Sequence, residues 1–373
     1  YFLRMTLFCI SIFIAFCYLS LIIYAMIGLR KNGNSKRLEH SFPFCSIVIA
    51  ARNEETAIKN ICRDLLSQSY PEDCYEIIIV DDHSEDGTIS TIKQFRDQRI
   101  CLVEAPEGVT GKKAALKYGL SQVHGEYIFF TDADCHVGSN WLETYIAQAI
   151  EGILFFGCVI PQISEKSTIV EKCAALDFIG IQAIQTGLAK QNHAFSCNGA
   201  NMCITRDFFV NHYDTNNNYS SGDDVFLLHK AKTLNSPNVR IIQDSSASVS
   251  TPMPQSISAF IRQRCRWASK AGGYKDRDSI AVSIIVYLTC LWLCISAIGV
   301  LFSSMIFLLC FILVFSAKMI GDLAIFIQTA SYYKSKKYLW LAIPFECVYF
   351  IYVTLIPIIV VVHPVQWKNR KIE

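Results

Sequence analysis

Two carboxylates stand two positions apart directly after an apolar run in segment 128–135, which reads IFFTDADC. If the strand continues through this segment, Ala133 points to the opposite side and Asp132 and Asp134 share one side. Clustered carboxylates repel each other unless a cation lies between them. Mg²⁺ takes one or two protein carboxylates and completes its shell with water and substrate phosphates. The spacing therefore predicts a site for a metal ion and a diphosphate.

Two other apolar runs also end in polar residues. The run 44–50 leads into Arg52 and Asn53, and the next apolar run ends at Asp81 and Asp82. In open α/β sheets, ligands bind beyond the carboxyl ends of the strands, so three such ends predict one cleft. Asp and Asn also favour turns, which is the simpler interpretation of any one strand end taken alone.

Two further motifs could act on a phosphate or a hydroxyl group. Gly111, Lys112 and Lys113 begin a predicted helix, whose N-terminus attracts anions, although the lysines could also lie on a solvated face. Asp223 and Asp224 follow a glycine in the motif SGDD, and a carboxylate separate from the metal ligands could act as a general base. The alternative is that Asp224 caps the following helix, and it can do both.

The motif QRCRW lies in the segment 255–275, just before a long apolar region. Gln263, Arg266 and Trp267 are spaced to share one face of a helix. Arginine can bind a diphosphate through two hydrogen bonds, and tryptophan offers a flat apolar surface with one donor. The alternative is a basic amphipathic helix that lies at a membrane surface with a tryptophan anchor.

The elements that must position these residues alternate between strands and helices. Short apolar runs alternate with helical patterns, at 44–50, 75–80, 100–103 and 126–131 for the runs and at 87–95, 112–123 and 139–150 for the helices. This alternation predicts an α/β fold with a mostly parallel sheet and helices on both faces. A long helix is expected at 169–190, and a turn at 198–202 precedes another short strand.

The chain is too apolar for an ordinary soluble protein, with 52% hydrophobic residues and a mean hydropathy of +0.31. Segments 5–29 and 280–317 carry no charge, and segment 338–362 carries only Glu346. A bilayer needs about 20 apolar residues per helix. We therefore expect one transmembrane helix in 1–30 and about three in 280–363. Lys318 and Asp322 are one helical turn apart and are expected to pair.

Basic residues between 30 and 37 favour an uncleaved anchor with its N-terminus outside and the following domain in the cytosol. The expected location is a bacterial inner membrane. Four spans would place the C-terminus outside, whereas Pro344 and Pro357 could make the last segment kinked or re-entrant. Three basic residues near the C-terminus favour the inside instead: Lys368, Arg370 and Lys371.

Other function classes find little support in the sequence. The net charge is +2, and no basic cluster has interleaved aromatic residues, so no nucleic-acid partner is expected. The 16 cysteines are scattered without paired CxxC motifs, which argues against structural zinc and for reduced thiols.

Taken together and in this order, VDDHSEDGT, GKKAAL, TDAD, SGDD and QRCRW resemble the motifs of membrane-bound family 2 glycosyltransferases. That family includes cellulose, hyaluronan and poly-N-acetylglucosamine synthases and many lipid glycosyltransferases. The resemblance covers about residues 42–275. It implies a GT-A catalytic domain at 42–254, a nucleotide-sugar donor, and Mg²⁺ or Mn²⁺ as cofactor.

On the donor side, the resemblance implies that Asp81 and Asp82 hold the uracil and ribose of a UDP-sugar. Lys112 would lie near the diphosphate, and Asp134 together with Asp132 would carry the metal ion.

On the acceptor side, Asp224 would be the base that deprotonates the acceptor hydroxyl. Gln263 and Arg266 would contact the donor diphosphate as the QRCRW segment closes over it. The remaining residues implied at the acceptor are Trp267, Asn198, Gly199 and Asp223.

The resemblance thus implies an inverting transfer of a sugar to a lipid or lipid-linked glycan at the cytosolic membrane face. A processive polysaccharide synthase is the alternative within the family, although few helices remain to build a polymer channel. A non-catalytic membrane subunit that binds a nucleotide sugar is an alternative of another class, and a lost base or broken carboxylate pair would favour it. A transporter would need a polar path, for which the apolar region offers four residues: Lys318, Asp322, Glu346 and His363. The oligomeric state stays open.

Overall fold

The computed structural model describes residues 2–31, 42–148, 152–212, 222–234, 238–302 and 305–362, and the backbone of 366–367 and 370–371. It divides into two compact units, and each is described by itself. The sheet unit comprises Asn32–Gln162 and Ser196–Pro252. The helical unit comprises Tyr1–Lys31, Ile163–Phe195 and Met253–Glu373.

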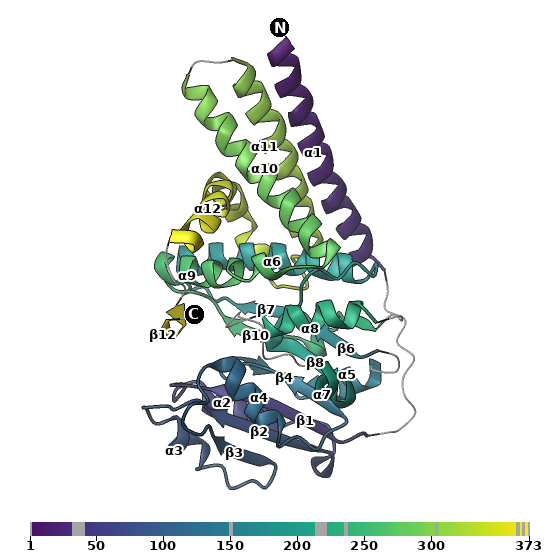
Figure 1. The fold of residues 1–373 in the computed structure, drawn as a ribbon, viewed down its shortest axis with the longest axis vertical. Coiled ribbons are helices and arrows are strands. Elements are labelled where there is room, and N and C mark those ends of the chain that lie inside the picture. Colours follow the sequence, from purple (N-terminus) through teal and green to yellow (C-terminus); the bar gives the residue numbers. More distant parts are fainter. Residues whose placement is uncertain are drawn as a thin grey trace. The chain divides into compact units, whose positions relative to one another are not determined.

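The sheet unit is built on a seven-stranded sheet in the order β3-β2-β1-β4-β8-β6-β9 (Figure 1). Neighbouring strands are parallel except at β8, which is antiparallel to both β4 and β6. The strands are β1 (Cys45–Ala51), β2 (Tyr75–Asp81), β3 (Ile100–Glu104), β4 (Tyr127–Phe130), β6 (Leu154–Gly157), β8 (Met202–Thr205) and β9 (Val239–Ile242). The mostly parallel α/β sheet expected from the sequence is confirmed. A small second sheet contains β5 (His136–Val137), β10 (Val249–Pro252) and β7 (Val159–Gln162).

The helices of the sheet unit follow the predicted alternation but are shorter at their ends. They are α2 (Ile58–Leu66), α3 (Thr88–Ile92), α4 (Lys112–Leu120), α5 (Trp141–Gln148), α7 (Arg206–His212) and α8 (Asp223–Lys232). Single 3₁₀ turns are η1 (Glu72–Cys74), η2 (Gly199–Asn201) and η3 (Ser245–Ala247). The helix predicted at 87–95 is reduced to the five residues of α3, of which Thr88 and Ile92 are buried.

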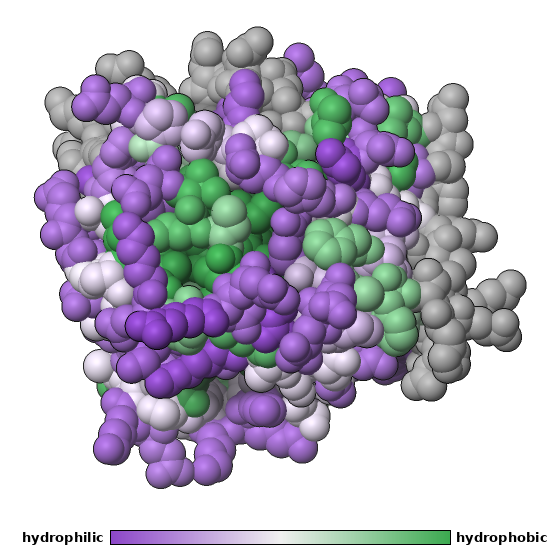
Figure 2. Space-filling view, turned by 90° about the horizontal axis from the view of Figure 1, so that it is seen from below, coloured by the Kyte–Doolittle hydropathy of each residue, from purple (hydrophilic) through white to green (hydrophobic). Residues whose placement is uncertain are grey.

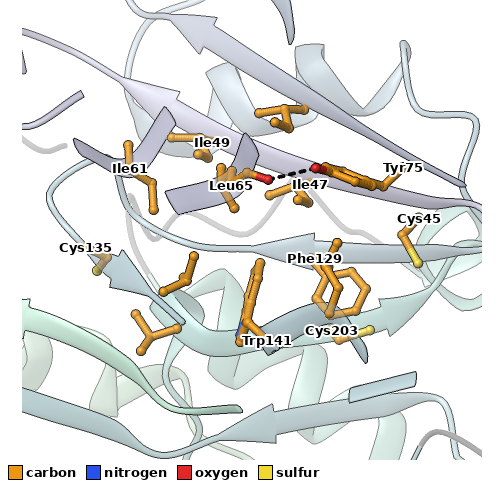
Figure 3. Packing of buried hydrophobic residues seen from close by; sticks show 14 of the residues in the cluster. Cys45, Ile47, Ile49, Ile61, Leu65, Tyr75, Phe129, Cys135, Trp141 and Cys203 are labelled. Carbon is orange, nitrogen blue, oxygen red and sulfur yellow. Dashed lines mark hydrogen bonds between the residues drawn. The ribbon is translucent and has the colours of Figure 1, made fainter. Parts of the chain in front are cut away.

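The core of the sheet unit packs the inner strands against α2 and α5 (Figure 3). Phe129 of β4 meets the Trp141 ring edge-on, with 5.1 Å between ring centroids. Tyr75, at the start of β2, donates its hydroxyl hydrogen to the Leu65 carbonyl at 2.9 Å. These contacts fix the strands whose carboxyl ends carry the predicted site residues.

The helical unit contains the long apolar helices expected from the sequence. Its elements are α1 (Phe2–Leu29), α6 (Ile169–Ala189), α9 (Ile257–Ala268), η4 (Ala271–Gly273), α10 (Arg277–Leu301), α11 (Met305–Thr329), η5 (Lys336–Leu341) and α12 (Ala342–Val362), and two short strands follow, β11 (Gln366–Trp367) and β12 (Arg370–Lys371). Among the described residues, four helical stretches are long and apolar enough to cross a membrane: Phe2–Leu29, Arg277–Leu301, Met305–Thr329 and Lys336–Val362.

Most of the exposed large apolar side chains lie on these four stretches, where a lipid environment would cover them. The face of the molecule drawn in Figure 2 differs in character. It is mostly hydrophilic and surrounds a recessed hydrophobic area.

The long helix α6 groups with the four apolar helices, although it lies inside the segment 42–254 expected to form one catalytic domain. The reason is packing against α1. A Cβ atom on Gly187 would lie 2.1 Å from the Ala25 carbonyl oxygen, and one on Gly28 would lie 1.8 Å from the Gly187 carbonyl oxygen. The two backbones therefore touch directly, and α6 buries its small-residue face against α1.

The predicted pair of Lys318 and Asp322 is confirmed, with 2.5 Å between the Lys318 Nζ and Asp322 Oδ2 atoms. The same ammonium group also bonds Glu346 at 2.5 Å, and the Tyr18 hydroxyl donates to Asp322 at 2.5 Å. All four side chains are buried. They satisfy one another and tie α1, α11 and α12 together.

The last helix, α12, runs without interruption through both prolines. Pro344 lies in its first turn, where no backbone donor is lost, and Pro357 lies inside the helix. His363 and Lys368 lie outside the described residues, and Arg370 and Lys371 are described only by their backbone.

Candidate active site

The carboxyl ends of β1 and β2 are tied together by hydrogen bonds around two buried aspartates. Arg52, just after β1, donates to the Asp82 carbonyl oxygen at 2.8 Å. Asp81 accepts from the Ser84 backbone N–H at 3.0 Å through Oδ2. Its buried Oδ1 has no hydrogen-bond partner within the described part of the chain. A buried carboxylate oxygen without a donor can accept an N–H from a ligand, because leaving it unpaired costs free energy.

Helix α4 links β2 to β4 through its first residues. The Gly111 N–H donates to Asp82 Oδ2 at 3.0 Å, and Gly111 has a φ of +93°, a conformation that favours glycine. Lys112 forms an ion pair with Asp132, and Lys113 lies 3.7 Å from Asp223 Oδ1. Both lysines thus face carboxylates. The Lys113 side chain is only 12% exposed, so the interpretation as a solvated face is wrong for Lys113, whereas the Lys112 side chain is 38% exposed. The helix N-terminus and both cations together favour an anionic ligand.

The strand does not continue through Asp132 and Asp134, so strand alternation is not what places the two side chains together. Strand β4 ends at Phe130, so both aspartates lie in the turn that follows, where the Cys135 N–H donates to the Asp132 carbonyl at 3.1 Å. The two carboxylates nonetheless meet, since ligand atoms of Asp132, Asp134 and Cys135 all lie within 4.8 Å of one another. A turn brings them together rather than the alternation of a strand.

The electrostatics of this pair fit a divalent cation. The pKa of Asp134 is raised to about 6, mainly by burial and also by the neighbouring charges of Asp132 and Glu54, while Lys112 opposes the rise. Negative charge is therefore incompletely compensated here, and a cation bound by carboxylate oxygens would relieve it. Hard oxygen donors suit Mg²⁺ and Mn²⁺.

Cys135 does not complete this ligand set. Its side chain is 1% exposed and belongs to the hydrophobic core, as the labelled side chain in Figure 3 shows. Burial raises the pKa of its thiol well above the ordinary value, so that the thiolate needed for metal binding is disfavoured. The two carboxylates remain as the candidate metal ligands.

Asp224 lies at the start of α8 and contacts the turn before β8. Gly222 is the residue before the helix, with a left-handed φ of +98°, so the interpretation of Asp224 as the helix cap is wrong. Asp224 Oδ2 accepts from the Gly199 N–H at 3.0 Å, and Oδ1 accepts from the Val225 N–H at 2.9 Å. Ser221, the first residue of the SGDD motif, lies outside the described residues.

The turn at 198–202 holds a residue that the sequence did not single out. Asn198 uses its side-chain oxygen to accept from the Ala200 N–H, which begins η2. Asn201 is fully buried and accepts from the side chains of Trp141 and Tyr145 at 2.9 and 2.8 Å. It also donates to two backbone carbonyls, at 2.9 Å each. The signal available in the sequence was a second asparagine in the glycine-bearing turn, directly before an apolar strand.

Most of the predicted site residues therefore lie in one continuous set of contacts in the sheet unit. This set runs from Arg52 and Asp82 through Gly111 to Lys112 with Asp132, then from Lys113 with Asp223 to Asp224 with Gly199.

Gln263, Arg266 and Trp267 lie in the helical unit, on α9, which Ser256 caps by accepting from the Ala259 N–H. The residue between them, Arg264, is buried, whereas the three predicted residues are partly exposed. Gln263, Arg266 and Trp267 thus keep some solvent exposure on this helix, so that a ligand could reach them. Arg264 is a further residue of the motif to which the sequence analysis assigned no role.

The family comparison agrees with this arrangement. Residues 46–210 match the family model described as glycosyl transferase family 2. The chain carries a family 2 glycosyltransferase domain. The match spans the carboxyl ends of β1, β2 and β4 and the turn that precedes β8.

Curated relatives of this family 2 domain include enzymes of glycolipid and polysaccharide synthesis. The chain is 35% identical over 116 residues to a beta-monoglucosyldiacylglycerol synthase from Trichormus variabilis, covering 30% of this chain and 25% of that protein. It is 26% identical over 241 residues to a poly-beta-1,6-N-acetyl-D-glucosamine synthase from Staphylococcus epidermidis, covering 62% of this chain and 54% of that protein. The chain thus spans from a quarter to about half of the length of these relatives.

The fold resembles that of a solved mannosyltransferase over nearly the whole chain. The mannosyltransferase PcManGT from Pyrobaculum calidifontis, solved with GDP-Man and Mn²⁺, superposes with a TM-score of 0.58 at 16% identity. The likeness covers 98% of this chain and 100% of that one. It confirms the GT-A fold expected from the sequence.

Proposed function

We propose that this protein transfers a sugar from a nucleoside-diphosphate sugar, first of all a UDP-sugar, to a hydroxyl group of a lipid or lipid-linked glycan. The observation that carries the proposal is the continuous set of contacts that joins Asp82, the Asp132–Asp134 pair and Asp224 in the sheet unit. Nucleotide recognition, diphosphate binding and a general base each need such a group, and here the three are neighbours.

The donor end of the proposed site recognises the nucleotide and its diphosphate. The unpartnered Asp81 Oδ1 accepts an N–H, which uracil and guanine both offer. Lys112 and the N-terminus of α4 attract the phosphates. Asp132 and Asp134 would hold Mg²⁺ or Mn²⁺, which when bound neutralises charge on the leaving diphosphate. Gln263 and Arg266 add donors to the phosphate oxygens.

The reaction is a direct displacement with inversion. The acceptor oxygen forms a bond to the anomeric carbon, the bond from that carbon to the phosphate oxygen breaks, and Asp224 takes the proton of the acceptor hydroxyl. The Gly199 N–H holds Asp224 Oδ2 at 3.0 Å and so orients the carboxylate. Trp267, with Asn198, Gly199 and Asp223, contributes to the acceptor side.

A lipid acceptor suits the four apolar helices, because an acceptor carried in a membrane reaches the protein without leaving the lipid. We propose that the helices cross a bacterial inner membrane with the sheet unit on the cytosolic side, where nucleotide sugars are made. The Trichormus relative is named for a glycolipid synthase, which supports the same class of acceptor.

The experiment that tests the proposed function is a donor and acceptor screen. Protein in micelles that contain diacylglycerol or a polyprenyl phosphate is offered UDP- and GDP-sugars with Mn²⁺ or Mg²⁺, and nucleoside diphosphate release is measured. We expect release that needs both an acceptor and the metal ion, and a glycosylated lipid in the mass spectrum. Tight donor binding without release or product would favour the non-catalytic subunit instead, and activity in excess EDTA would contradict the metal assignment.

A processive polysaccharide synthase is the second candidate. One observation favours it: the alignment with the poly-N-acetylglucosamine synthase extends over 241 residues, about twice the length of the alignment with the glycolipid synthase. The product distribution decides between the two. One sugar per lipid supports single transfer, and a ladder of long chains that grows before the acceptor is consumed supports the synthase.

A further inference from the structure

Arg264 is the buried centre of a cluster within the helical unit. Its side chain is 7% exposed, and its Nε atom donates to Asp177 Oδ2 of α6 at 2.5 Å. A second guanidinium nitrogen pairs with the same oxygen, and a third donates to Gln263 Oε1 at 2.8 Å. The guanidinium carbon lies 4.2 Å from the ring centroid of Trp267 and 4.6 Å from that of Phe260. One side chain thus contacts two of the three residues of the predicted QRCRW face.

The opposite end of the cluster is fully hydrogen-bonded. Asp177 is 3% exposed, and its second carboxylate oxygen accepts from the Tyr352 hydroxyl of α12. The carboxylate therefore neutralises the guanidinium and is held from two helices. Burying an ion pair costs free energy in desolvation, so apolar residues could hold α6, α9 and α12 together as well or better. The charged cluster calls for an explanation beyond stability.

The cluster determines which way the Gln263 amide points. An arginine guanidinium can only donate hydrogen bonds, so Gln263 must present its oxygen to Arg264. The amide nitrogen, with two N–H donors, then points away from Arg264. A pair of donors suits phosphate oxygens, whereas the flipped amide would present a carbonyl oxygen that repels them.

The same guanidinium restrains the Trp267 ring. Arg264 lies over this ring at cation–π distance, and the Phe178 ring of α6 lies 6.1 Å away at an interplanar angle of 43°. These contacts hold an aromatic side chain that is only partly buried in one orientation.

We propose that Arg264 is a positioning residue that presents the Gln263 amide as a phosphate donor and fixes the Trp267 ring, and that Asp177 and Tyr352 hold it in place. The inference rests on the proposed function, because it deepens the roles of Gln263 and Trp267 there. The chemistry recognised is that of a diphosphate, which accepts hydrogen bonds but does not donate them when ionised.

The first test does not depend on activity. The five tryptophans of the full chain are labelled with 5-fluorotryptophan, and the Trp267 resonance is assigned with Trp267→Phe. Arg264→Lys keeps a positive charge beside Asp177 but loses the planar group that stacks on Trp267. We expect it to move or broaden the Trp267 fluorine signal and leave the other four. Arg262→Lys is the matched control, because Arg262 is exposed on the same helix and bonds only Ser258 among the contacts described for it.

An unmoved Trp267 signal in a folded Arg264→Lys protein would overturn the positioning role, whatever the enzyme's activity. Arg264→Met goes further, since it leaves Asp177 buried without its cation. If that variant fails to fold, the lysine variant still gives the answer.

The second test measures kcat/KM for the donor found in the screen. We expect Arg264→Lys to lower kcat/KM about tenfold, as for the loss of one hydrogen bond from a charged group. If Arg264 acts through Gln263, the same change made in a Gln263→Leu protein lowers it less than about threefold. Equal effects in both backgrounds would refute action through Gln263. If the unmodified protein turns over no donor, the proposed function fails, and the fluorine spectra still decide the positioning role.

Discussion

The replacement Asp224→Asn tests the assignment of the general base most directly. Asparagine is almost the same size and keeps one oxygen acceptor, but it cannot take a proton at neutral pH. In the structure both carboxylate oxygens of Asp224 accept backbone N–H groups, from Gly199 at 3.0 Å and Val225 at 2.9 Å. The new NH₂ group must face one of these two donors, so one hydrogen bond is lost.

The structure allows the two effects of this replacement to be separated by size. Loss of one hydrogen bond lowers the free energy of unfolding by about 1 kcal/mol. Loss of a general base lowers kcat by about 10²–10⁴-fold, which corresponds to roughly 3–5 kcal/mol in the transition state. The rate effect therefore exceeds the folding effect several-fold and cannot arise from a small unfolded fraction.

The assay compares nucleoside diphosphate release, equilibrium binding of the donor nucleotide with Mn²⁺, and thermal unfolding. We expect Asp224→Asn to bind the nucleotide within about twofold of the unmodified protein, because the base acts on the acceptor and not on the donor. Asp207→Asn is the matched control, since Asp207 is an exposed aspartate in the first turn of α7 in the same unit. Turnover by Asp224→Asn within a few-fold of the control would refute the assignment.

Three further outcomes are expected. Mn²⁺ should raise the unfolding temperature at about pH 7.5 and lose this effect near pH 5, because the pKa of Asp134 is raised to about 6 and its protonated carboxyl cannot bind the ion. An equal Mn²⁺ effect at both pH values would contradict the assignment of Asp134 as a ligand. Without metal the pH dependence is opposite: the folded state holds the Asp134 proton more tightly than the unfolded chain, so the contribution of Asp134 to stability falls as pH rises through 6. Gly187→Ala should cost about 3 kcal/mol in detergent denaturation, because its Cβ would lie 2.1 Å from a carbonyl oxygen of α1, whereas Gly180→Ala, 3.4 Å from its nearest contact, should cost far less. Lys318→Met should lower stability by about 3–5 kcal/mol by stranding buried carboxylates, and Glu346→Gln in the same chain should restore part of it; a double variant as unstable as the single one would show that the charges are not coupled.

Local features of the chain were readable from its sequence. Short apolar runs ending in Asp81–Asp82 and before Asp132 predicted strands and a polar edge, because a strand buried on both faces must be apolar throughout its length. Long apolar segments with few or no charges predicted the four apolar helices, because nearly every residue of such a helix meets lipid or another helix. The order of five short motifs indicated the family before any contact was known.

Tertiary structure decided how these local features meet. Strand β8 is antiparallel to its neighbours β4 and β6. Its sequence did not predict this direction, because β8 is buried on both faces like the parallel strands and shows no alternation. Asp132 and Asp134 meet in a turn beyond β4, because the strand ends with its apolar run at Phe130 and does not continue through the acidic residues.

The contacts between residues far apart in the chain could not be predicted either, because they depend on how distant elements pack. Arg264 bonds Asp177, 87 positions away, and Asp177 bonds Tyr352, 175 positions away. Within the sequence Arg264 is one more basic residue in a basic motif, and Asp177 is one of two acidic residues in a mostly apolar helix. Composition and spacing along one helix determined which chemistry the chain could offer. Only the packing of α6, α9 and α12 decided which side chains hold one another in place, because burial makes each charged group depend on a partner that the local sequence does not contain.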